Sequence, residues 1–140
     1  MKPKKIRYFI CESPMIVTSK RQCEEMKALG NPVDLLEKTL EECYGWGNGY
    51  VVIPPGHPLY GENFDENLLD CERNISFVHF GRDCDSSFDI PKDEQDHLIV
   101  GFDTYQYRED KGPSPYTKEY VEAQAKHLAE QLQAMWLKVN

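Results

Sequence analysis

The sequence predicts an α+β protein in which a small antiparallel sheet of three to four strands is packed by two or three helices. Three observations favour this class. Short apolar runs separated by turn residues are typical of strands, and no helical pattern lies between residues 53 and 97 to serve as a crossover. The carboxyl end carries a long amphipathic helical pattern. With 140 residues, the chain has room for a single domain over 1–140.

Four segments read as strands. Residues 5–11 alternate Ile6, Tyr8 and Ile10 with Arg7, Phe9 and Cys11, which indicates a strand with two different faces. Three further apolar runs follow at residues 50–53, 75–80 and 97–102. The connectors are rich in Gly, Pro, Asn and Asp, and we therefore expect the strands to pair in a meander.

Two helices are expected before residue 46. A Ser19 cap, good helix formers and a closing Gly30 predict a short helix over residues 19–29. Asn31 followed by Pro32 predicts a second helix that ends at Gly45, with an apolar stripe at Val33, Leu36, Leu40 and Cys43 or Tyr44.

The carboxyl-terminal helix is the clearest element. Ser114 or Thr117 can cap it, and apolar residues recur at four-three spacing at Val121, Ala125, Leu128, Leu132, Met135 and Val139. Fewer than three heptads seldom sustain a coiled coil, so we expect this stripe to pack on the protein's own sheet. A homodimer through the same helix is the alternative.

The charge balance narrows the classes of partner. The formal net charge is −8, which argues against binding a nucleic-acid backbone, and no apolar run approaches the ~18 residues of a membrane span. Residues 61–96 hold eleven acidic and three basic side chains, so this stretch accounts for the whole excess, with near-neutral flanks.

The amino end has too short an apolar run for a signal peptide, and the five cysteines are odd in number and widely spaced. We therefore expect reduced thiols and a cytoplasmic location, with no cofactor and no resident metal. Asp83, Asp85, Ser87, Asp89 and Glu94 imitate a calcium loop. Phe88 stands where that loop needs glycine, so the acidic stretch is interpreted as a solvated loop.

The segment from Gly45 to Gly61 is the densest in unusual features. Three glycines in five residues allow a sharp turn or a close backbone approach, and a Pro-Pro-Gly-His-Pro loop then holds His57 with little freedom. Such a loop can aim an imidazole, although a histidine bonded to a loop carbonyl would leave the same pattern.

Four segments in order resemble a widespread family of small bacteriophage and prophage proteins. They are GNGYVVIPPGHPLYG at 47–61, VHFG at 78–81, VGFDT at 100–104 and YTKEYVEAQAKHLAEQL at 116–132. The resemblance covers residues 47–132 as a family-like core, and residues 1–46 form a variable amino-terminal part. It implies a phage context, and a location in the host cytoplasm, rather than a particular reaction.

The family's matching polar residues are His57, His79 and Asp103 in this chain. Two positions depart from the family pattern: Phe80 replaces a glycine after Val-His, and Gln106 replaces a histidine. Glutamine neither exchanges a proton near neutral pH nor binds a metal through an imidazole nitrogen. The resemblance therefore implies an impaired or altered site if that histidine serves as a base or ligand.

Two site hypotheses follow. His57, His79 and Asp103 come near the ends of three predicted strands, where two imidazoles and a carboxylate would suit acid–base catalysis or an open metal site. Aromatic, amide and guanidinium groups would suit a planar ligand or a protein interface. The ligand-binding candidates are Asn48, Tyr50, Tyr105, Gln106, Tyr107 and Arg108, with Tyr116 and Tyr120 close by in sequence.

Three functions compete at this point. The first is a phage-associated accessory protein that binds a host protein or a small nucleotide-like ligand and so antagonises host defence or metabolism. The second is a small hydrolase of a phosphate ester or nucleotide that uses His57, His79 and Asp103. The third is an acidic decoy in which residues 61–96 imitate nucleic acid.

Overall fold

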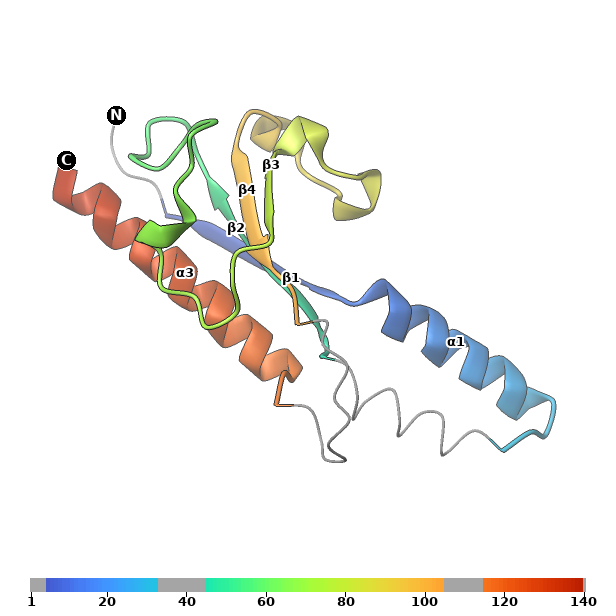
Figure 1. The fold of residues 1–140 in the computed structure, drawn as a ribbon. Coiled ribbons are helices and arrows are strands. Elements are labelled where there is room, and N and C mark those ends of the chain that lie inside the picture. Colours follow the sequence, from blue (N-terminus) through green and yellow to red (C-terminus); the bar gives the residue numbers. More distant parts are fainter. Residues whose placement is uncertain (1–4, 33–44, 105–114, 140) are drawn as a thin grey trace.

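The computed structural model describes residues 5–32, 45–104 and 115–139, and it confirms the α+β class (Figure 1). One four-stranded antiparallel sheet contains β1 (Arg7–Glu12), β2 (Gly47–Ile53), β3 (Phe77–Phe80) and β4 (Leu98–Phe102). Helix α1 (Pro14–Ala28) follows β1, and helix α3 (Lys118–Val139) ends the described chain. Residues 33–44, over which the second helix is expected, lie outside the described residues.

The strands do not pair as the expected meander. Their order is β1-β2-β4-β3, so the last strand in sequence lies between β2 and β3. Every residue of β4 is buried, whereas the burial of β3 is only partial. A strand that is apolar on both faces belongs in the middle of a sheet, and the non-alternating sequence LIVGF of β4 carries that signal.

Helix α1 begins earlier than predicted, at Pro14 rather than near Ser19. Proline at the first helical position loses no hydrogen bond and presets the helical φ, so the Ser-Pro step starts the helix instead of breaking the chain. Figure 1 shows α1 leading away from the sheet at the end of β1.

Helix α3 packs on the sheet of its own chain, as expected, and covers β1 and β2. The Thr117 hydroxyl accepts a hydrogen bond from the Tyr120 N–H at 3.2 Å and caps the helix. The buried stripe keeps the 3.6-residue period of a straight helix and therefore ends on Trp136, while Val139 is exposed. Its members are Val121, Ala125, Leu128, Ala129, Leu132 and Trp136.

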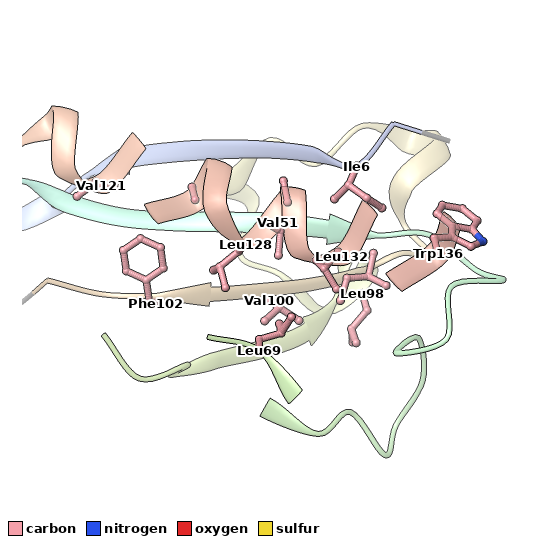
Figure 2. Packing of buried hydrophobic residues seen from close by; sticks show 13 residues of the cluster. Ile6, Val51, Leu69, Leu98, Val100, Phe102, Val121, Leu128, Leu132 and Trp136 are labelled. Carbon is pink, nitrogen blue, oxygen red and sulfur yellow. The ribbon is translucent and has the colours of Figure 1, made fainter. Parts of the chain in front are cut away.

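The sheet has two unlike faces. On the α3 face, Val51, Leu98 and Val100 meet the helix in an aliphatic core, which Figure 2 shows from close by. The strap (residues 59–75) completes this face, because the Gln131 amide bonds both the N–H and the C=O of Asp70 at 2.7 Å.

The opposite face is the ring face. Tyr50, Val52 and Ile99 form its buried part, and Phe9, Phe77 and Phe88 pack around them. The cover segment (residues 81–96), built of three short 3₁₀ turns, lies over this face. Arg7 of β1 holds its far end through a two-pronged hydrogen bond to the Glu94 carboxylate.

Candidate functional site

His57 is built into the core of the α3 face. Its ring is only 4 % exposed and meets the Trp136 ring edge-on at 5.4 Å. The Leu59 N–H donates to Nδ1 at 3.0 Å, so Nε2 carries the proton and donates to the Leu132 C=O at 2.7 Å. Burial lowers the pKa of His57, against the smaller raising effect of the Leu132 hydrogen bond. Nδ1 therefore closes the loop on itself, and Nε2 holds the loop onto α3.

His79 lies on the other side of the sheet. It pairs with Ile99, its side chain is exposed on the ring face, and its ring contacts Phe77 at 4.6 Å. The sheet separates this imidazole from His57.

Asp103 lies at the opposite end of the sheet from the His57 loop. Its carboxylate accepts a hydrogen bond from the Ser76 hydroxyl at 2.9 Å and faces the Arg73 guanidinium at 3.8 Å. Arg73 Nε also donates to the Asp103 C=O at 3.0 Å. The pair ties the end of the strap to the end of β4.

The structure therefore does not bring His57, His79 and Asp103 together. The physical reason is strand direction: β2 and β4 are antiparallel, so the residues that follow them leave at opposite ends of the sheet. Within the described ranges, no group of three or more His, Cys, Asp or Glu side chains is placed to hold a metal ion.

The ligand-binding candidates divide in the same way. The Tyr50 ring is 4 % exposed, its hydroxyl accepts a hydrogen bond from the Asn48 amide at 3.2 Å, and burial raises its pKa to about 12. Tyr50 is thus a member of the ring face, and Asn48 is half-buried beside it. Tyr105, Gln106, Tyr107 and Arg108 lie outside the described residues.

A second group of aromatic and cationic side chains meets where β2 begins and β4 ends. We name it the aromatic end and define it by Trp46, Arg73, Tyr116 and Lys118. The Trp46 N–H donates to the Tyr116 C=O at 2.8 Å. The Arg73 guanidinium lies 5.0 Å from the centre of the Tyr116 ring, and the Lys118 ammonium lies 5.9 Å from that of Trp46.

Buried packing fixes the aromatic end to the sheet. The Thr104 hydroxyl hydrogen-bonds both the C=O (2.5 Å) and the N–H (3.3 Å) of Gly47. A side chain on Gly47 would collide with the Cys11 C=O, which explains one of the clustered glycines. The sequence analysis did not identify three members of this group, because they lie far apart in the chain: Trp46, Arg73 and Lys118. The one local signal was the Gly-Trp-Gly step at Trp46, whose glycines allow a close approach of the backbone.

The acidic residues of 61–96 divide between two segments of the chain. Glu62, Asp65, Glu66, Asp70 and Glu72 belong to the strap region on the α3 face, whereas the six later carboxylates belong to the cover segment on the ring face. In the cover segment, the Asp85 carboxylate accepts a hydrogen bond from the Ser87 N–H at 2.9 Å and so caps its own turn. A decoy needs its carboxylates on one surface, and the decoy function stays a prediction.

The described cysteines Cys11, Cys23, Cys71 and Cys84 are all free thiols. Burial raises the pKa of Cys11, Cys84 and Cys71, in the last case to about 11, so these groups are protonated at neutral pH and weakly nucleophilic. No helix among the described elements has the length and apolar character needed to cross a membrane.

Comparisons of the chain with protein-family models, with curated proteins and with solved structures found no match.

Proposed function

We propose that this chain is a phage-associated protein that acts by binding, and that its ligand docks at the aromatic end. The observation that carries the proposal is the meeting of two ring–cation pairs, Tyr116 with Arg73 and Trp46 with Lys118, at one end of the sheet. The phage context rests on the resemblance of residues 47–132 alone.

A small nucleotide-like ligand fits this chemistry best. Aromatic rings stack on the π-face of any nucleobase, at roughly 1–3 kcal/mol per base. Lys118 supplies positive charge for a phosphate, on a molecule whose net charge is −8, and Arg73 adds a second cation that also faces Asp103.

A host protein is the second candidate for the same surface. Trp, Tyr and Arg are the side chains that most often carry the binding energy of protein interfaces. Lys118 and Arg73 would then meet acidic groups of that partner instead of a phosphate.

Calorimetric titration with ribonucleoside mono- and triphosphates tests the first candidate. We expect saturable binding that weakens at least about tenfold, or 1.4 kcal/mol, in Trp46→Ala and in Lys118→Ala. Lys92→Ala, an exposed lysine of the cover segment, is the matched control and should bind normally. Chromatography of the nucleotides after incubation separates binding from turnover, and products would favour the hydrolase.

If no nucleotide binds at millimolar concentration, the small-ligand form of the proposal is wrong. The host-protein form is then tested with a photo-crosslinking residue at position 116 in infected cells. It predicts a discrete crosslinked partner that disappears in Lys118→Glu and persists in Lys92→Glu. Crosslinks that survive both changes would remove the aromatic end as the binding surface.

A further inference from the structure

The outer edge of β1 carries regularly spaced backbone groups that no described strand pairs. The Ser13 N–H donates to the Trp46 C=O, and this pair continues the register of β1 with β2. Hydrogen-bonded pairs alternate along an antiparallel ladder, so Arg7, Phe9 and Cys11 direct their backbone groups at β2. Tyr8 and Ile10 consequently direct theirs outward, and so does Ile6, whose N–H reaches the Gln133 side chain at 2.9 Å.

Helix α3 lies alongside β1, and eight residues of the helix span nearly the same length as four residues of the strand. Ile6 is level with Gln133, and Ile10 is paired with Gly49, where an added side chain would lie 3.1 Å from the Ala125 Cβ. Four strand residues, about 13 Å, thus match eight helix residues, about 12 Å. Tyr8, halfway along β1, is therefore level with Ala129, halfway along this part of α3.

An open groove of about 380 Å³ runs between the two elements. Tyr8 of β1 and the two residues just before that strand, Lys5 and Ile6, line one side of it. The α3 side is lined by Lys126, Ala129, Glu130 and Gln133. Along α3, the cationic Lys126 lies three residues before Ala129, and the anionic Glu130 lies one residue after it. Under a two-fold rotation through the level of Ala129, Lys126 of one copy comes within about 3 Å, along the helix axis, of Glu130 of the other. The two Glu130 side chains come equally close, so the four side chains form one cluster with no net charge.

We propose that a second copy of this chain occupies the groove, with the two β1 strands pairing antiparallel about a two-fold axis at Tyr8. The two Tyr8 residues would exchange N–H and C=O hydrogen bonds, and Ile10 would donate to Ile6 of the partner subunit. The result is one continuous eight-stranded sheet with both α3 helices on the same face. This inference is independent of the ligand at the aromatic end.

The helix spacing agrees with this assembly. Each α3 lies over β1 and β2, so its axis is about one strand spacing from the two-fold axis. The two helices would then run about 10 Å apart, which is the packing distance of contacting helices. An unrelated extended peptide could satisfy the strand edge, but only a second copy brings the complementary Lys126–Glu130 pattern.

Sedimentation equilibrium of the full chain, from about 1 to 100 µM, tests the proposal. We expect twice the monomer mass of 16.3 kDa at the upper concentrations. Lys126→Glu alone and Glu130→Lys alone should each raise the dimer Kd at least tenfold, because like charges then face across the axis. The double exchange Lys126→Glu with Glu130→Lys should restore the dimer.

Two further variants guard against loss of folding. Tyr8→Pro removes an outward N–H, which an edge strand tolerates, and should give a folded monomer by circular dichroism. Lys138→Glu, an exposed change elsewhere on α3, should leave the dimer intact. A wild-type monomer throughout the range, or a double exchange that stays as weak as the single variants, would overturn the inference.

Discussion

The two faces of the sheet are closed by different means. On the α3 face, a 22-residue helix buries a continuous aliphatic stripe, including Leu128 and Leu132 at 0 % exposure. On the ring face, an irregular segment covers the rings with half-buried side chains such as Phe88 and Ile90, and an ion pair to Arg7 anchors it. Burial of apolar area stabilises far more than exposed charge pairs do, so the α3 face should carry most of the folding free energy and the ring face the local motion.

The largest change in unfolding free energy should come from shortening one apolar side chain on each face. Leu128→Ala empties a fully buried site and should lower the unfolding free energy by about 2–5 kcal/mol. Phe88→Ala removes more carbon atoms, yet from a half-buried ring, and should cost about 1–2 kcal/mol. Urea denaturation of both variants measures the difference. Equal losses would show that the ring face is as much a core as the α3 face.

Thiol reactivity compares the same two faces through their cysteines. A pKa of about 11 leaves Cys71, which packs at the α3 face, with about one part in a thousand of thiolate at pH 8. We expect it to react with a disulfide reagent about a hundredfold more slowly than an unperturbed thiol. Single-cysteine variants retaining Cys71 or Cys84 give the rates. Faster labelling at Cys71 than at Cys84 would contradict the comparison.

Acid should weaken the α3 face through His57. Its folded pKa lies below the unfolded value near 6.5, so the unfolded chain binds more protons as the pH falls. Stability is therefore complete above that value and should decline as the pH drops through it. His57→Gln should flatten this decline, while His79→Gln, on the exposed ring face, serves as the control. Melting temperatures between pH 8 and 5 provide the measurement.

The smallest effect concerns the anchor of the cover segment. Arg7→Met removes a partly exposed ion pair and should lower global stability by less than about 1 kcal/mol. Hydrogen exchange should nevertheless speed up in the cover segment, for example at the Arg82 N–H that donates to the Gln95 C=O at 2.9 Å. Unchanged exchange there would mean that the Arg7–Glu94 ion pair does not limit the motion of the segment.

The positions of the strands could be predicted from local sequence, but their order could not. Alternation and apolar runs are properties of a few neighbouring residues, and all four expected strands are present. Order depends on which strand is buried on both faces. The sequence LIVGF of β4 does not alternate, and this indicates a strand that is buried on both faces. The prediction of a meander was wrong because it assumed that strands adjacent in sequence are adjacent in the sheet.

The candidate site was less predictable because it depends on strand direction and on distant residues. His57 was recognised as tightly held, and the structure shows that its loop holds it against α3. Arg73 and Tyr116 come from separate segments and meet only because β4 and the strap bring them together. Spacing along the chain carries no signal for such a pair.

The central place of β4 has a consequence for how the chain is made. Before residues 98–102 have been synthesised, β2 has only β1 as a partner, and an isolated pair of strands is marginal in water. The aliphatic face is covered only after α3 has also been synthesised. Closing these long loops is slow, so the nascent chain exposes its apolar strands until that helix is available. Folding of this sheet is therefore a late event for which the carboxyl-terminal helix is required.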